Sequence, residues 1–178
     1  MKELLLLTIA LLFAQVTFAQ KIDTEASKIE FEVSNMGKIV KGTLLNLKGT
    51  VNFDANNLEA SSFEATVDPA TVDTKSKGRD KHLQKDDFFG VATYSTVKVR
   101  SNTITKTETG YEAAATLTIR DVSTDITIPF TIEKEGEQQH LMGTFLIQRK
   151  EYGLGEKMGA GSIGLEVTVH IDCFVNLK

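Results

Sequence analysis

The chain has 178 residues, with 20 Lys and Arg against 24 Asp and Glu, which gives a net charge of −4. Acidic and basic residues are mixed along the sequence, which argues against nucleic-acid binding, since such proteins cluster positive charge. The single cysteine, Cys173, excludes an internal disulfide, and only two prolines and no low-complexity tract are present to form a linker. The composition therefore predicts one domain, large enough to bury a core.

The first residues have the pattern of a secretory signal peptide. Residues 4–12 form an apolar run that is too short to span a bilayer, which takes about 20 apolar residues. The small residues Thr17 and Ala19 predict cleavage after Ala19. We therefore expect residues 1–19 to be a signal peptide and residues 20–178 to be a periplasmic or secreted domain with no membrane span.

Apolar and polar residues alternate through most of the domain, as half-buried β-strands do. The pattern predicts a strand at 28–33, a long second strand that follows the turn at 35–37 and includes 45–53, and a third at 63–67. Further strands are predicted near 92–107, 111–119, 126–132 and 141–149. In the second strand we expect Leu45, Leu47, Val51 and Phe53 on one face, with a bend at Gly49. The last strand has the longest single apolar face, formed by Ile163, Leu165, Val167, Val169, Ile171, Cys173 and Val175.

The length of that last strand favours a barrel over a small open sheet. About eight antiparallel strands, short turns and one helical crossover predict an all-β fold. We expect a single antiparallel up-and-down β-barrel, lipocalin-like, with one short helical crossover. An open sheet edge would permit a homodimer, but nothing in the sequence requires one.

The predicted crossover includes residues 78–90, which are dense in charge and end in two aromatic residues and a glycine. Leu83, Phe88 and Phe89 form an apolar cluster there, while the charged residues stay in water. We interpret the segment as a lid or plug at one end of the barrel. The alternative is a solvated connection whose aromatic residues cap the core.

An eight-stranded barrel has room inside for side chains or for one slender ligand. The small inward residues Ala113, Ala115 and Gly143 favour a ligand, whereas Phe31, Phe53, Phe63 and Phe145 could instead fill the interior. The candidate ligand-binding residues are Phe31, Phe53, Leu83, Phe88, Phe89, Ala113, Ala115, Phe145 and Tyr152. The candidate polar residues of the lid and mouth are Arg79, Asp80, His82 and Arg149.

The sequence gives little support to catalysis or metal binding. Asp80 and His82 could form part of a dyad in a hydrolase or isomerase, but no nucleophile elbow is present and the two side chains diverge on a helical turn. His82, His140 and His170 have no paired metal-ligand spacing. We expect no enzyme activity, no metal and no cofactor, with a dyad at Asp80 and His82 as the catalytic alternative.

The order of the motifs resembles the YceI-like family over almost the whole domain. The motifs are Ser27-x-Ile29-x-Phe31-x-Val33, Val40-x-Gly42, Asp73-Thr74, Arg79-Asp80-x-His82-Leu83-x-x-x-Asp87-Phe88-Phe89, Arg149-x-x-Tyr152-Gly153 and Ile163-Gly164-x-Glu166-Val167. The sequence departs from the family at Ala26 and Asn35, where relatives often carry histidine. If those histidines touch a ligand head group in relatives, the preference of this chain differs.

The resemblance implies an exported, non-enzymatic protein that sequesters or carries a long-chain apolar lipid, isoprenoid or fatty-acyl, inside its barrel. It also implies that His82 hydrogen-bonds across to hold the crossover on the barrel, with Arg79 and Asp80 as a local ion pair. The alternative function is an envelope structural, partner-binding or stress module with a packed barrel and no ligand.

Overall fold

The computed structural model describes residues 19–177, so the predicted signal peptide, apart from Ala19, lies outside the described residues. The strands are β1 Gln20–Lys21, β2 Lys28–Asn35, β3 Lys38–Asn52, β4 Ser62–Asp73, β5 Val97–Lys106, β6 Tyr111–Ile119, β7 Val122–Glu135, β8 Gln138–Gln148 and β9 Ile163–Asn176. The helices are the 3₁₀ helix η1 Leu58–Ala60, the α-helix α1 Lys77–Leu83 and the 3₁₀ helix η2 Arg149–Tyr152. None of the helices between residues 19 and 177 is long and apolar enough to cross a membrane.

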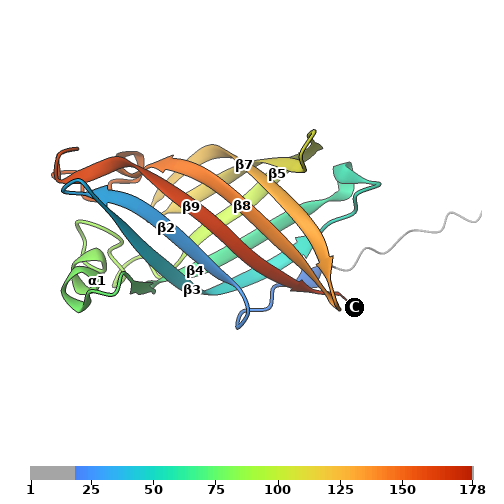
Figure 1. Ribbon diagram of the computed structural model, residues 1–178, viewed down its shortest axis with the longest axis horizontal. Helices are drawn as coiled ribbons and strands as arrows, with labels where there is room; N and C mark the ends of the chain where they lie inside the picture. The colour runs from blue at the N-terminus through green and yellow to red at the C-terminus, as the bar shows by residue number, and fades with distance from the viewer. Residues whose placement is uncertain (1–18, 178) are drawn as a thin grey trace, which may run out of the picture.

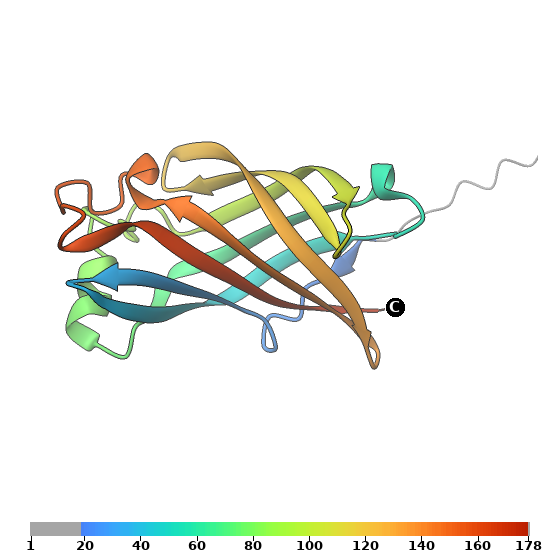
Figure 2. The ribbon, with the colours of Figure 1, turned by 45° about the horizontal axis from the view of Figure 1, so that its top comes forward.

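Strands β2 to β9 form a closed antiparallel barrel (Figures 1 and 2). Each strand pairs with the next one along the chain, and β9 returns to pair with β2, which closes the sheet. The short β1 pairs with the end of β3, and the next residue, Ile22, bridges to Val175 of β9, so this segment continues the barrel wall between β3 and β9 beyond the start of β2. The predicted up-and-down barrel with one short helical crossover is confirmed.

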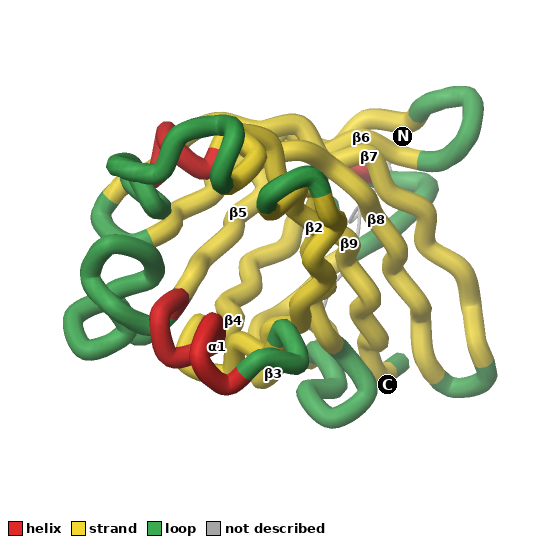
Figure 3. The backbone as a smooth tube through the Cα atoms, turned by 60° about the vertical axis from the view of Figure 1, so that its left-hand side comes forward, coloured by secondary structure: helices red, strands yellow, loops and turns green. Residues whose placement is uncertain are grey.

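The barrel has two ends that differ in their connections. One end, called the helix end, carries α1 and the connections 36–37, 74–96, 120–121 and 149–162. The other end, called the opposite end, carries the connections 22–27, 53–61, 107–110 and 136–137. Figure 3 brings the helix end forward, with α1 at the edge of the barrel. Every connection thus belongs to one of two surfaces.

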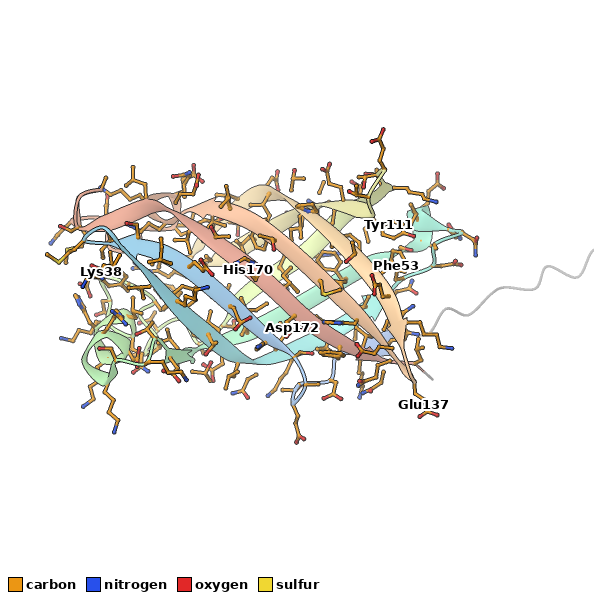
Figure 4. All side chains as sticks on the ribbon, viewed as in Figure 1. Lys38, Phe53, Tyr111, Glu137, His170 and Asp172 are labelled. Carbon is orange, nitrogen blue, oxygen red and sulfur yellow. The ribbon has the colours of Figure 1, made fainter. Side chains whose placement is uncertain are left out.

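Aromatic side chains fill the half of the barrel near the opposite end. Phe53 packs edge-on against Tyr111, with ring centroids 4.8 Å apart, and both contact Phe130. Phe63 packs edge-on against Phe130 from β4, at 6.3 Å. Figure 4 shows Phe53 and Tyr111 together near that end. Such pairs add to the hydrophobic gain of burial, and they leave the other half of the interior to different residues.

Two strands depart from the strict alternation that the sequence predicts. Leu45 was expected on the inner face with Leu47, but it is 47% exposed and Leu44 is buried instead. Asn46 has φ 61°, and the register of β3 against β4 shifts on both sides of Leu45, so a bulge reverses the faces. Leu165 is likewise exposed, because the register of β2 against β9 shifts beside it.

Two strand boundaries also differ from the prediction. β7 begins at Val122 rather than near 126, because Arg120, with φ 60°, makes a tight turn that continues the pairing to Ile119. β5 begins at Val97 rather than near 92, because Thr93 and Tyr94 donate hydrogen bonds back to Gly90. The β4–β5 crossover, residues 74–96, is therefore longer than expected and extends over the helix end.

Candidate ligand-binding cavity

The half of the barrel near the helix end encloses a cavity of about 230 Å³. A cavity of roughly 150 Å³ lined by Leu, Ile and Phe can hold benzene, so this one admits a larger apolar group. Along β2 the cavity is lined from Ile29 to Asn35, a span of roughly 20 Å of strand. Because barrel strands tilt by about 40° from the barrel axis, the cavity is about 15 Å deep along that axis.

Inward-facing aliphatic residues of all eight barrel strands form the cavity wall. The pattern that places them there is the period-two alternation of each strand. They include Val33, Val40, Leu44, Leu47, Ala65, Val67, Val97, Val99, Leu117, Ile128, Ile147, Val167, Val169 and Ile171. A wall of this kind is apolar and offers few hydrogen-bonding groups.

The crossover covers the cavity with an apolar cluster. Phe88 is only 5% exposed, and Leu83 and Phe89 are partly buried against the core. The amide of Phe89 donates to the carbonyl of Leu83, and Phe88 donates to Lys85, so tight turns after α1 direct both rings inward. Gly90, with φ 58°, ends the turn in a conformation that favours glycine. The three side chains line the cavity as a cap.

Thr74 organises the polar side of this cap. Asp80 Oδ1 accepts hydrogen bonds from the backbone amide of Thr74 at 2.9 Å and from its hydroxyl at 2.5 Å. Arg79 donates through Nε to the hydroxyl oxygen of Thr74 at 2.7 Å and through Nη2 to its carbonyl at 2.8 Å. The predicted ion pair between Arg79 and Asp80 is therefore wrong: both side chains bind Thr74. Within residues 19–177 the Nη1 group of Arg79 has no hydrogen-bond partner, and Arg79 lines the cavity.

The side-chain hydrogen bond of His82 joins two residues of the crossover and does not join the crossover to the barrel wall. Its Nε2 atom hydrogen-bonds to Oδ2 of Asp87 at 2.7 Å, and its ring packs edge-on against Phe88, 5.0 Å between centroids. The hydrogen bond from His82 is the main cause that lowers the pKa of Asp87 below its ordinary value. The backbone carbonyl of Asp87 accepts from the amide of Gly155. The expected bond across to the barrel is thus replaced by a link to the 149–162 loop.

Arg149 shapes that loop from within. Its side chain is 2% exposed, and burial lowers the pKa of its guanidinium group. Its five N–H donors all bind backbone carbonyls at 2.7–3.0 Å, those of Leu154, Gly155, Met158, Ile163 and Gly164. A guanidinium offers five donors in a fixed plane, so one side chain fixes the path of the whole loop. This path places Leu154 on the cavity and Gly155 against Phe88.

Most of the predicted site residues gather around this cavity. Of the predicted apolar set, those that line it are Phe31, Leu83, Phe88, Phe89 and Phe145. Of the predicted polar set, Arg79, His82 and Arg149 line it. These residues come from β2, β8, the crossover and the loop after β8, segments that the closed barrel brings together at its helix end.

The remaining predicted residues lie elsewhere. Phe53 belongs to the aromatic cluster near the opposite end, and Ala113 and Ala115 are fully buried in the packed core. Tyr152 is buried under the loop, where its hydroxyl bonds to that of Thr124. Asp80 supports the cap through Thr74 without lining the cavity. The small residues of β6 therefore accommodate close packing and do not enlarge the cavity.

Sequence reasoning did not assign the aliphatic wall or Thr74 to the site. The signal for the wall was present, because Val33 lies on the same face as Phe31 in an alternating strand. Gly42 was part of a motif, and the structure gives the reason: a β-carbon there would clash with the ring of Phe31, its partner across β2 and β3. The role of Thr74 depends on groups that meet only in the folded chain.

The site contains few groups suited to chemistry. Asp80 binds Thr74 and His82 binds Asp87, and no hydrogen bond joins Asp80 to His82. Cys173 is buried, and burial raises the pKa of its thiol to about 12. No group of three or more His, Cys, Asp or Glu side chains within residues 19–177 is placed to hold a metal ion. His170 lies on the outer face of β9, as Figure 4 shows.

The model of the YceI-like domain matches residues 20–174. This chain belongs to the YceI-like family. A UPF0312 protein of Pseudomonas syringae pv. tomato is 29% identical over 149 residues, 79% of this chain and 78% of the relative. Protein YceI of Salmonella arizonae is 26% identical over 184 residues, 96% of each chain.

Solved structures share the YceI-like fold. BcnA of Burkholderia cenocepacia superposes with a TM-score of 0.80 at 24% identity, covering 86% of this chain and 98% of the other. A polyisoprenoid binding domain from Saccharophagus degradans, implicated in plant cell wall breakdown, gives a TM-score of 0.72 at 19% identity, covering 90% and 99%. At these identities the likeness shows the barrel with its helical crossover.

Proposed function

We propose that this YceI-like protein is an exported, non-enzymatic carrier that holds the chain of an isoprenoid or fatty-acyl lipid inside its barrel. The observation that carries the proposal is the apolar cavity of about 230 Å³ beneath Leu83, Phe88 and Phe89. Each CH₂ group that leaves water for such a site contributes about 0.8 kcal/mol. The name of the Saccharophagus degradans domain, polyisoprenoid binding, supports the same ligand class, and the N-terminal pattern supports export.

In this proposal the polar end of the lipid lies at the mouth of the cavity, which we define as its helix end beside Arg79. Arg79 has an N–H group with no partner within the described part of the chain, and it borders a wall that is otherwise mostly aliphatic. The Nη1 group of Arg79 is not among the buried polar atoms that lack a partner, so it is open to water, and an oxygen acceptor of a head group would take the place of water there. Because the cavity is smaller than the roughly 300–1,000 Å³ of drug-sized pockets, a long chain would extend beyond it at the mouth.

The first experiment is native mass spectrometry of the mature protein purified from its own cells, before and after solvent extraction. We expect a mass excess that extraction removes and that matches a prenyl or acyl chain. An unliganded mass, unchanged after incubation with farnesol or palmitate, would contradict the proposal and favour the partner-binding module.

A pair of neighbouring substitutions on β9 tests the location. Val169 lines the cavity, between Phe31 and Phe145 on the adjacent strands. Thr168, the next residue, borders a groove on the outer surface. Val169→Trp is expected to abolish binding of the fluorescent probe N-phenyl-1-naphthylamine, and Thr168→Trp to preserve it. Equal binding by both variants, each folded by circular dichroism, would place the ligand outside the barrel.

A further inference from the structure

The connections at the two ends of the barrel carry opposite net charge. The connections of the helix end contain nine Lys and Arg and six Asp and Glu, whereas those of the opposite end contain six Asp and Glu and no Lys or Arg. The protein as a whole is acidic, with a net charge of −4. Figure 4 shows the two ends through Lys38 and Glu137. The positive end is the one that holds the cavity.

Most of the lysines at the helix end are exposed and form no ion pair among the described residues. Seven of its lysines are exposed: Lys38 at the start of β3, and Lys75, Lys77, Lys81, Lys85, Lys150 and Lys157 in the connections. Among the described residues only Lys75 of these seven forms an ion pair, with Asp73 at 2.7 Å. The other six ammonium groups have no carboxylate within ion-pair distance among residues 19–177, although six Asp and Glu lie in the same connections.

Apolar side chains project at the same end. Met36, at the tip of the β2–β3 turn, is 80% exposed, and Ile39 is 62% exposed. The turn is held in place because the amide of Met36 donates to the carbonyl of Ser162 in the 149–162 loop, at 2.9 Å. Ile39 also borders an outer groove with Leu165, which the bulge in β9 turns outward. Large apolar side chains this exposed at a rim with lysines are typical of surfaces that contact membranes.

We propose that the helix end docks on an anionic lipid bilayer, with the lysines over the head groups and Met36 and Ile39 inserted at the interface. This inference rests on the proposed lipid-carrier function, because docking in this orientation places the cap, Leu83, Phe88 and Phe89, against the source of the cargo. Each lysine near an anionic membrane raises the binding affinity roughly fivefold. A second copy meeting helix end to helix end would oppose two sets of lysines, which like-charge repulsion disfavours.

The test is sedimentation with lipid vesicles, using charge reversals that change the net charge equally at the two ends. Lys77→Glu with Lys81→Glu alters the helix end, and Lys106→Glu with Lys134→Glu alters exposed lysines near the opposite end. We expect wild type to bind vesicles of phosphatidylcholine and phosphatidylglycerol, to bind pure phosphatidylcholine weakly, and to dissociate at high salt. Loss of two lysines at the helix end should weaken binding by about 25-fold or more, and the control pair should leave it unchanged.

The apolar contribution is tested separately. Met36→Ser with Ile39→Ser is expected to weaken vesicle binding, while Met142→Ser, at an exposed position on the wall of the barrel, is expected to leave it unchanged. Equal losses in the two charge-reversed proteins would overturn the proposal, because net charge alone would then explain binding. Equal binding to neutral and anionic vesicles would also overturn it, as would a vesicle signal that ultracentrifugation traces to head-to-tail association of copies.

Failure of the docking proposal can be distinguished from failure of the carrier function. All variants are first tested for binding of N-phenyl-1-naphthylamine in solution, which we expect to be retained, since none of the substituted residues lines the cavity. A protein that binds the probe but not anionic vesicles refutes docking alone. A protein that binds neither the probe nor any extracted lipid refutes the carrier function, on which the docking proposal depends.

Discussion

Replacing Arg149 by methionine should detach the loop that follows β8. The guanidinium is buried and donates to five carbonyls within 149–164, with no carboxylate among its partners. Hydrogen bonds from a charged group contribute roughly 1.5–3 kcal/mol each. Their sum would rival the net stability of a typical domain, roughly 5–15 kcal/mol. Two effects make the loss of stability smaller than this sum. The variant avoids the cost of burying an ion, which is several kcal/mol, and the freed carbonyls can bind water as the loop opens.

We expect a net loss of about 3–5 kcal/mol in the free energy of unfolding, because each carbonyl left without its donor costs roughly 1–3 kcal/mol and only some of the five recover a bond to water. Urea denaturation followed by circular dichroism measures it, and hydrogen exchange should show faster exchange at the amide of Gly155, which donates to Asp87. Arg149→Lys has three donors in place of five, so its stability should lie between those of wild type and Arg149→Met. Lys150→Met, at the exposed neighbour, should change stability by less than about 0.5 kcal/mol. A loss below about 1 kcal/mol for Arg149→Met, with unchanged exchange in the loop, would refute the reasoning.

Three further outcomes follow from the structure. Gly42→Ala should displace the ring of Phe31, reducing probe binding and stability together, as measured by fluorescence titration and urea denaturation. Cys173, buried and with its thiol pKa raised to about 12 by burial, should react with iodoacetamide at neutral pH only as fast as the protein unfolds. The hydrogen bond from His82 stabilises Asp87 as the carboxylate and lowers its pKa in the folded protein. The contribution of Asp87 to folding stability is therefore present above the pKa of the unfolded chain, and it is lost as pH falls through the lower pKa of the folded protein. Asp87→Asn should therefore lose less stability than wild type on acidification from about pH 5 to 3, a difference below about 1 kcal/mol because the pair is nearly half exposed.

Each of these has a contrary result. Normal probe binding by Gly42→Ala would mean that the barrel absorbs the shift of Phe31 without narrowing the cavity. Alkylation of Cys173 faster than global unfolding would reveal local opening of β9. A steeper acid dependence in Asp87→Asn than in wild type would reverse the sign argued above.

The barrel itself could be predicted from the sequence because alternation is a local property. The run from Ile163 to Val175 and the regular face of 111–119 each define a strand without reference to any partner. The errors at Leu45 and Leu165 have one physical cause, because a bulge depends on how two distant strands meet. In β3 the irregularity reverses the inward face on one side of Leu45, whereas in β9 two residues are added and Ile163 and Val167 both still line the cavity, so only Leu165 turns outward. A sequence pattern holds no record of that pairing.

The site divides in the same way. Leu83, Phe88 and Phe89 could be assigned to the cap because an apolar cluster in a charged segment must be buried somewhere. The polar contacts could not be assigned, since the guanidinium of Arg149 binds backbone carbonyls, and the amide and carbonyl of Thr74 take part beside its hydroxyl. Every residue carries an amide and a carbonyl, so no side-chain pattern marks those partners. Neighbours in sequence, Arg79 and Asp80, therefore suggested a pair that the fold does not form.

The division of the interior gives a physical reason for a ligand. Aromatic rings pack the half near the opposite end, and that packing needs no guest to be stable. The other half holds about 230 Å³ of cavity. At about 24 cal/mol per Å³ an unfilled cavity of that size costs about 5.5 kcal/mol relative to a filled core. A chain that fills it restores those contacts, so ligand binding and barrel stability should rise together. Val33 and Val169, both on the cavity wall, are among the small side chains that leave this volume open.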